Sequence, residues 1–313
     1  MEQFEQLVTL MEKNQIATLK KRLGGMNATD VAAFLENLDP EKRLLVFRVL
    51  PKDLAADVFT ELTPATQQKL IDGLTDTELK AVVDELCVDD ATDLVEEMPA
   101  NVVKRLLAQA DPDMRKSINE LLRYPEDSAG SIMTIEFVAL RPQMTAADAI
   151  ASIRRTGMDK ETVNNCYLID ESRHLLGVVS LRGIVMARED ARMQDIMETN
   201  VISVTTQEDQ ESVARLFSLY DLNVLPVVDT ENRMVGIVTV DDAIDVIEEE
   251  TTEDISKMAA ITPSDRPYLK TSVWMLWKSR IPWLLLLMLS ATFTGMIITH
   301  FEGVLSFSIA LTA

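Results

Sequence analysis

The sequence predicts a multidomain chain: an all-α superhelix, then an α/β segment, a connecting helix and one transmembrane α-helix. Three observations predict this order. They are a twelve-residue repeat of apolar positions, a pattern of strands and helices that recurs after about 60 residues, and a long apolar stretch near the end. With 313 residues, of which 47% are hydrophobic and 26% charged, the chain has the size and composition of more than one folded domain.

The first segment, residues 1–130, is predicted to be the superhelix. Apolar residues recur at steps of twelve, at Leu38, Leu50, Leu62, Leu74, Leu86, Met98, Ala110 and Leu122. Asp39-Pro40, Thr63-Pro64 and Asp111-Pro112 follow three of these positions, which places a capping residue before a proline at the first position of a helix. Each repeat therefore predicts one short helix, and stacked pairs of such helices form a scaffold and a surface for partners.

The second segment consists of two copies of a strand, helix, strand-turn-strand, helix pattern, over residues 131–195 and 196–252. Ile132-Met133 recurs as Ile196-Met197, and the run from Leu176 to Ser180 recurs as Val235 to Thr239. Short β-rich runs alternate with helical patterns in both copies, so this segment is predicted to be an α/β repeat.

The chain is strongly acidic, with 51 Asp and Glu against 30 Lys and Arg and a net charge of −21. The acids concentrate before residue 257. Such a surface repels nucleic acid and favours divalent cations as partners, although acidity that only keeps the protein soluble is the alternative. Cys87 and Cys166 form no Cys-x-x-Cys pair, and His174 and His300 stand alone, so spacing predicts no transition-metal site.

Residues 281–301 form an apolar run whose only ionisable residue is His300, long enough to cross about 30 Å of hydrocarbon. The alternative is a buried helix of a soluble protein. Lys278 and Arg280 precede the run and the start of the chain lacks a signal peptide, so residues 1 to about 280 are expected in the cytoplasm. Residues 302–313 are too few for a second span, and we expect a truncated start of further membrane segments.

A connecting helix is predicted over residues 253–280, preceded by a dense run of acids. Between positions 241 and 254 the acids are Asp241, Asp242, Asp245, Glu248, Glu249, Glu250, Glu253 and Asp254. Like charges on one helix repel, and bound cations reverse that effect. Oxygen ligands without nitrogen or sulfur suit Mg²⁺, while a solvated acidic helix is the alternative.

The order of these segments, with the motifs at residues 124–134 and 239–248, resembles the MgtE family, and the two α/β copies resemble CBS domains. The resemblance implies a magnesium transporter or channel that is multi-pass in the cell membrane when intact. It also implies a homodimer that forms through the CBS domains, and a connecting "plug" helix that closes the pore when cytosolic sites hold Mg²⁺. The later membrane helices of the family are missing from this sequence.

The resemblance further implies which acids bind Mg²⁺. They are Asp89, Asp93, Asp209, Glu211, Asp221, Asp242, Asp245, Glu250, Glu253 and Asp254. The hypothesis is that Mg²⁺ joins Asp89 and Asp93 to the CBS and plug carboxylates, and that its loss lets the domains separate. Without that assembly, several of these acids are ordinary helix-capping residues.

Adenine nucleotide is the rival ligand. Thr239 and Asp242 fit a Ser/Thr-x-x-Asp motif for ribose, whereas the first copy has Gly183 in place of the acid after Ser180. A membrane-tethered nucleotide sensor that regulates a transporter is therefore the alternative function, and ATP is a second candidate ligand beside Mg²⁺. Without a phosphate-binding loop or a nucleophile elbow the sequence predicts no enzyme, and a magnesium-dependent hydrolase is the remaining catalytic alternative.

Overall fold

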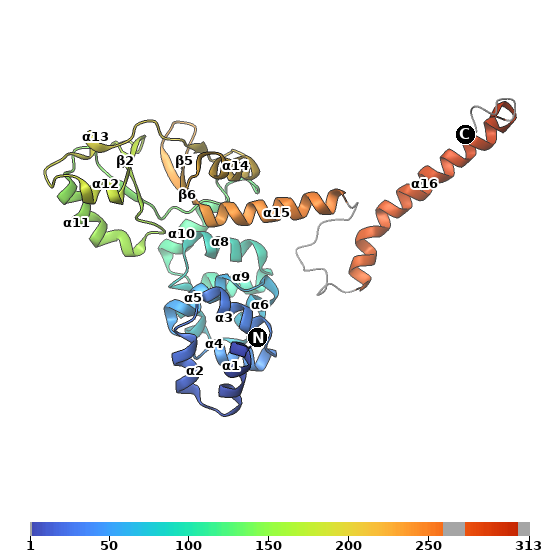
Figure 1. Ribbon diagram of the computed structural model, residues 1–313, viewed down its shortest axis with the longest axis horizontal. Coiled ribbons are helices and arrows are strands. Elements are labelled where there is room, and N and C mark those ends of the chain that lie inside the picture. The colour runs from blue at the N-terminus through green and yellow to red at the C-terminus, as the bar shows by residue number, and fades with distance from the viewer. Residues whose placement is uncertain (1, 259–272, 306–313) are drawn as a thin grey trace. The chain divides into compact units, whose positions relative to one another are not determined.

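The computed structural model describes residues 2–258 and 273–305 of the chain (Figure 1). The chain divides into two compact units, Met1–Ala243 and Ile244–Ala313. The first unit contains a helical domain and two small β-sheets, and the second contains most of one acidic helix and one apolar helix.

The helical domain is built from short helices that pack against one another (Figure 1). They are α1 (Glu2–Glu12), α2 (Ile16–Leu23), α3 (Ala28–Glu36), α4 (Pro40–Phe47), α5 (Lys52–Thr60), α6 (Pro64–Gly73), α7 (Asp76–Val83), α8 (Val88–Glu97), α9 (Ala100–Gln109) and α10 (Pro112–Leu121). From α4 onward each helix begins twelve residues after the one before it. Seven of the eight apolar repeat positions, Leu38 through Ala110, are buried between the helices. The predicted one helix per repeat is confirmed for α4 to α10.

The predicted capping residues are only partly used as caps. The Asp111 side chain accepts a hydrogen bond from the backbone N–H of Met114 at 2.7 Å. Asp39 and Thr63 precede their helices as expected but make no side-chain cap. Thr63 instead donates its hydroxyl hydrogen to the Glu36 carboxylate at 2.7 Å. Proline at the first helical position therefore sets the start of α4 and α6 without a cap.

The α/β segment forms two three-stranded sheets of the same topology. The first copy contains β1 (Val138–Leu140), α11 (Ala146–Thr156), the short 3₁₀ helix η1 (Gly157–Asp159), β2 (Asn165–Ile169), β3 (Leu175–Ser180), α12 (Leu181–Met186) and α13 (Met193–Ile196). The second contains β4 (Val204–Thr205), α14 (Gln210–Tyr220), β5 (Val224–Val228), β6 (Met234–Thr239) and then α15 (Val240–Met258). In both sheets the first strand pairs parallel with the second, which pairs antiparallel with the third.

The segment that precedes each copy pairs with the third strand of the other copy. Thr134, before β1, donates its N–H to the carbonyl of Ile237 in β6 at 2.8 Å. Glu198, before β4, accepts from the N–H of Val178 in β3 at 3.0 Å. A Cβ on Gly236 would lie 2.6 Å from the carbonyl oxygen of Thr134, so only glycine fits there. This exchange explains why Ile-Met and glycine recur together in the sequence.

The helical domain and the two sheets are joined within the first unit. After α10, Ala129 donates its N–H to the carbonyl of Glu208 at 2.7 Å, and Gly130 donates to that of Thr206 at 3.0 Å. These bonds connect the end of the helical domain to the loop between β4 and α14. In Figure 1, α8 and α10 lie on the side of the helical domain that faces the sheets.

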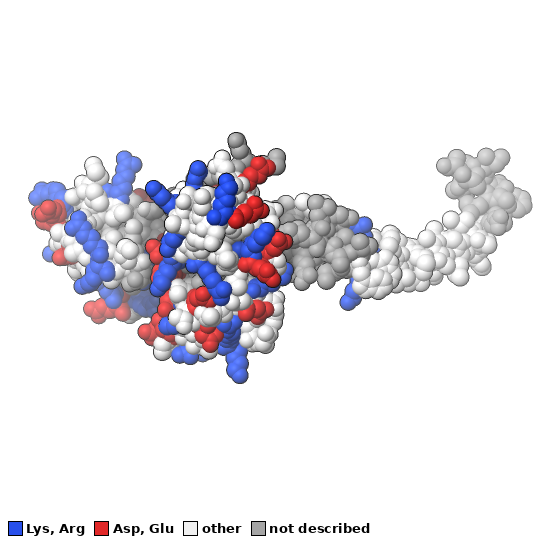
Figure 2. Space-filling view, turned by 90° about the horizontal axis from the view of Figure 1, so that it is seen from below, with Lys and Arg blue, Asp and Glu red and all other residues white. Residues whose placement is uncertain are grey.

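In the second unit, α16 (Val273–Leu305) contains the one stretch of the described residues that is long and apolar enough to cross a membrane. That stretch, Arg280–Phe301, has a mean hydropathy of 2.0 and is not buried against other parts of the chain. In Figure 2 it is white over most of its length, whereas positive and negative side chains intermingle over the helical domain. Of the predicted connecting helix, residues 253–258 belong to α15 and 273–280 to α16, and residues 259–272 lie outside the described residues. Of residues 302–313, the first four continue α16 and the rest are also outside them.

Candidate functional site

Carboxylates gather where α8 of the helical domain meets the α/β repeat. Asp89 lies in the first turn of α8, is only 9% exposed, and its Oδ1 atom has no hydrogen-bond partner. Burial first, and then the charges of Asp90, Asp242 and Glu161, raise the pKa of Asp89 well above its ordinary value. Because Asp242 and Glu161 belong to the α/β repeat, the site spans two domains of the first unit.

Two more acids of α8 share this environment. Burial followed by the charge of Asp242 raises the pKa of Asp90 to about 7 and that of Asp93 to about 8. The Asp90 side chain is half-buried, whereas that of Asp93 is exposed. Solvent therefore screens the charge of Asp93 more than that of Asp90. Asp90 was not among the ligands predicted from the sequence, although its position beside Asp89 was a signal.

Asp242 contributes from the start of α15, within the first unit. Thr239 precedes α15, and its hydroxyl donates to Asp242 Oδ2. Burial is the main cause that raises the pKa of Asp242 to about 6, while the bond from Thr239 opposes it. In the first copy, Ser180 accepts instead from the N–H of Gly183 at 3.1 Å, so no carboxylate occupies the equivalent place.

A further group of side chains lies at the same junction. Cys87, Asp89, Glu136 and Glu161 each offer one ligand atom, and these four atoms lie within 4.8 Å of one another. Burial chiefly raises the pKa of the Cys87 thiol, and the neighbouring Glu161 carboxylate raises it further. Burial raises the pKa of Glu136, and the nearby backbone N–H of Val88, the first residue of α8, partly opposes this rise. No pattern in the sequence points to Glu136 and Glu161, because they follow Cys87 by about 50 and 75 positions.

Three predicted ligands of the second copy have other structural roles. Asp209 caps α14 by accepting from the N–H of Ser212 at 3.0 Å. Glu211 forms an ion pair with Arg215. Asp221 ends α14 in the left-handed conformation, with φ of 53°. A metal-binding role for Asp209, Glu211 and Asp221 stays a prediction.

The remaining predicted ligands lie on α15 in the second unit. They are Asp245, Glu250, Glu253 and Asp254. Glu253 forms an ion pair with Lys257 at 2.7 Å, and the hydrogen bond that Lys257 donates to Glu253 is the main cause that raises the pKa of Lys257. Their metal-binding role is also a prediction.

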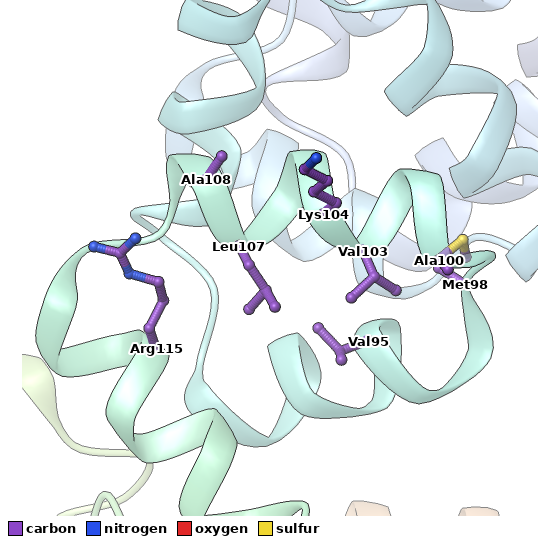
Figure 3. Close-up of a pocket in the computed structure, with 8 residues that line it drawn as sticks. All are labelled: Val95, Met98, Ala100, Val103, Lys104, Leu107, Ala108 and Arg115. Atoms are coloured by element: carbon purple, nitrogen blue, oxygen red, sulfur yellow. The ribbon is translucent and has the colours of Figure 1, made fainter.

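A hollow of about 680 Å³ lies on the helical domain between α8, α9 and α10 (Figure 3). Its lining residues are Val95, Met98, Ala100, Val103, Lys104, Leu107, Ala108 and Arg115. The side chains are apolar or basic, and none is an acid. This hollow is therefore not the cation site.

Comparison with known proteins identifies the family. The MgtE intracellular N domain matches residues 26–127, and the CBS domain matches residues 129–190 and 193–249. The magnesium transporter MgtE of Thermus thermophilus is 39% identical over 305 residues, covering 96% of this chain and 68% of the relative. The chain belongs to the MgtE family. The magnesium transporter MgtE of Bacillus subtilis is 32% identical and covers 97% of this chain and 67% of that relative.

Two solved structures share the fold. The cytosolic domain of the Mg²⁺ channel MgtE, in complex with ATP, is 40% identical with a TM-score of 0.72, covering 77% of this chain and 99% of that one. The soluble part of a magnesium transporter is 29% identical with a TM-score of 0.73, covering 80% and 98% respectively. The predicted fold class, a helical domain followed by tandem CBS domains and an apolar helix, is confirmed for this MgtE-family chain.

Proposed function

We propose that this chain is the Mg²⁺-sensing cytosolic part, and the beginning of the membrane part, of a magnesium transporter or channel. One observation carries the proposal. Asp89, Asp90 and Asp93 on the helical domain lie close enough to Asp242 on the second CBS domain that its charge, added to burial, raises the pKa of each of the three. Carboxylates that approach in this way are stabilised by a divalent cation, and oxygen-only ligands with room for water favour Mg²⁺.

The same geometry supports a gating mechanism. A cation between α8 and Asp242 binds only when the helical domain lies against the CBS domains, so it stabilises that arrangement. When Mg²⁺ is scarce, repulsion among the ionised acids favours separation. A ligand shifts such an equilibrium only as far as its affinities for the two states differ, so the split site is what makes sensing effective.

The membrane setting follows from α16 and from the relatives. Arg280–Phe301 has the length and hydropathy of a membrane span, and Trp274 and Trp277 stack at 4.7 Å near its start, where indole rings favour the headgroup zone. The relatives that cover nearly all of this chain are named as magnesium transporters. We therefore propose a transport role rather than a catalytic one, with residues 1 to about 280 in the cytoplasm, a multi-pass intact protein and a homodimer formed through the CBS domains.

ATP is a second candidate ligand, supported by the Thr239 and Asp242 pair and by the relative solved with ATP. A ribose bound by Asp242 would use a carboxylate that we assign to the cation site. Nucleotide and Mg²⁺ are therefore expected to influence each other's affinity. The alternative of a nucleotide sensor that ignores Mg²⁺ is less well supported, because it leaves the acids of α8 without a role.

The test is a thermal unfolding series of the full chain in detergent micelles, with Mg²⁺ raised from chelated to millimolar levels. We expect the melting temperature to rise with Mg²⁺. When Mg²⁺ reaches about 100 times its dissociation constant, the free energy of unfolding should be higher by about 2.7 kcal/mol. Asp242→Asn should remove most of this rise. Asp113→Asn, an exposed acid in the first turn of α10, is the matched control and should keep it.

A melting temperature independent of Mg²⁺ in the unaltered chain would contradict the sensing proposal. An equal rise in melting temperature in Asp242→Asn would instead mean that the cation binds elsewhere than between α8 and the second CBS domain. Addition of ATP in the presence of chelator tests the alternative function. A melting temperature that rises with ATP alone and does not respond to Mg²⁺ would favour the nucleotide sensor.

A further inference from the structure

The group of Cys87, Asp89, Glu136 and Glu161 differs from the site proposed for Mg²⁺ because it includes a thiol. Its four ligand atoms lie within 4.8 Å of one another. Two of the residues come from the start of α8 in the helical domain, and two come from loops of the first CBS domain. Asp242 of the second CBS domain is not a member, so the two sites share Asp89 alone.

The loops that carry the two glutamates are tied together by the backbone. Glu161 donates its N–H to the carbonyl of Glu136 at 2.9 Å. Burial raises the pKa of Glu136, and the backbone N–H of Val88 in α8 partly opposes this, so the Glu136 carboxyl lies beside the start of α8. The two loops are thus held together before any ligand arrives, which lowers the cost of assembling a site.

A second observation points to a missing ligand. Asp89 is only 9% exposed, and its Oδ1 atom is buried without a hydrogen-bond partner. Buried carboxylate oxygens nearly always have a partner, because an unsatisfied one costs about 1–3 kcal/mol or more in mutational studies of proteins generally. The groups around this oxygen are acids, so a bound cation satisfies it best.

We propose that Cys87, Asp89, Glu136 and Glu161 form a binding site for a thiophilic divalent cation, with Zn²⁺ as its type, at the junction of the helical domain and the first CBS domain. When the metal binds, the Cys87 thiol loses its proton to the solvent and the sulfur forms a bond to the metal. The metal is neither oxidised nor reduced. One thiolate and three carboxylates supply the four ligands of a tetrahedral site.

The donor set decides between cations. A thiolate is a strong ligand for Zn²⁺ and a poor one for Mg²⁺, which takes oxygen ligands and retains water. Zn–S and Zn–O bonds are about 2.3 and 2.0–2.2 Å long, and four atoms within 4.8 Å of one another are near enough to converge on one ion. Cys87 is half-buried, so an ion can reach it, and Lys160 acts on Glu136 and offsets part of the negative charge.

The spacing of residues in the sequence predicted no transition-metal site, because neither cysteine has a partner nearby along the chain. The fold instead brings the glutamates to Cys87 from another domain. Since the ligands come from both domains, a bound ion holds α8 against the first CBS domain. This inference about binding does not depend on Mg²⁺ sensing and goes beyond the function proposed above.

The experiment is titration of the full chain in detergent with Co²⁺, an optical substitute for Zn²⁺, in buffer containing excess Mg²⁺. We expect a thiolate-to-cobalt charge-transfer band that Zn²⁺ abolishes by displacement. Cys87→Ser should remove the band and weaken Zn²⁺ binding by about tenfold or more, and Glu161→Gln should weaken it while retaining the band. Cys166→Ser alters the buried cysteine of β2 and should leave band and affinity unchanged.

Absence of the band in the unaltered chain, or a band that survives in Cys87→Ser, would overturn the proposal. So would Zn²⁺ binding that is equally tight in Cys87→Ser and the unaltered chain. The Mg²⁺ melting series distinguishes this failure from that of the proposed function. Cys87→Ser keeps every acid of the Mg²⁺ site and should retain the Mg²⁺ response, and Asp242→Asn should retain the cobalt band.

Discussion

Helices α7 and α8 are successive repeats of one superhelix, yet their first turns are in opposite environments. Thr75 and Glu78 of α7 form a reciprocal capping box, and Arg48 contacts Glu78 at 2.9 Å. Twelve residues later, Cys87 and Asp90 occupy the same positions in α8. Cys87 does not cap its helix, and Asp90 is surrounded by other carboxylates.

The pKa values of Glu78 and Asp90 shift in opposite directions. The N–H of Thr75, and then Arg48, lower the pKa of Glu78. Burial and the charge of Asp242 raise that of Asp90 to about 7. The first turn of α7 is satisfied by its own domain, whereas that of α8 gains its partners from the CBS domains. The repeat therefore specifies the helices, and a departure from its capping chemistry marks the site.

The largest effect is expected from Asp89→Asn in the absence of divalent cations. Removing a buried charge that faces other acids should raise stability by roughly 1–3 kcal/mol, or about 2–4 °C in melting temperature for each kcal/mol. The same substitution should reduce the stabilisation by Mg²⁺. Thermal unfolding in chelator and in Mg²⁺ measures both effects.

The control is Asp84→Asn, at the end of α7, where the acid is exposed and contacts Lys80 at 2.6 Å. Loss of this surface ion pair should lower stability by no more than about 1 kcal/mol, with or without Mg²⁺. If Asp89→Asn destabilised the metal-free chain instead, the contrast between α7 and α8 would be wrong.

The sequence predicted the elements well because local patterns determine them. Apolar residues every twelve positions, with Asp-Pro and Thr-Pro pairs, place the starts of α4 to α10, and the recurring Ile-Met and glycine positions mark the two CBS copies. Caps were less predictable, since Thr63 donates its hydroxyl hydrogen to Glu36, a residue of an earlier helix.

The sequence predicted those residues of the candidate site that residue type or the family resemblance indicates. Asp89, Asp93 and Asp242 were expected to meet, and the structure brings them together. Glu136 and Glu161 were missed because a single glutamate in a loop has no distinctive pattern. Only the packing of α8 against the first CBS domain gives them a shared role.

The next effect is a pH dependence that Mg²⁺ should suppress. Burial and neighbouring acids raise the pKa of Asp242 to about 6 and of Asp90 to about 7, from an ordinary value of 3.8. Between about pH 4 and 7 the folded chain therefore binds more protons than the unfolded chain, and stability falls as pH rises through that window. Above about pH 7 the stability of the folded chain is reduced by the full amount.

Melting curves in chelator from pH 5 to 8 measure how stability changes with pH. Asp90→Asn should flatten this dependence, because the variant lacks the group that takes up the proton. Mg²⁺ should flatten it too by stabilising the ionised acids. Stability that rises steadily over this range in chelator would show that these carboxylates are ionised and compensated by other groups.

The smallest effect belongs to α7. Thr75→Ala removes the hydroxyl that accepts from the N–H of Glu78, and should lower stability by about 1 kcal/mol. Thr75→Ser keeps the hydroxyl and should lose less. Because this first turn takes its partners from the helical domain alone, the loss should be equal in chelator and in Mg²⁺. A loss from Thr75→Ala that varied with Mg²⁺ would mean that α7 and α8 respond together, and that the sensing surface extends across both repeats.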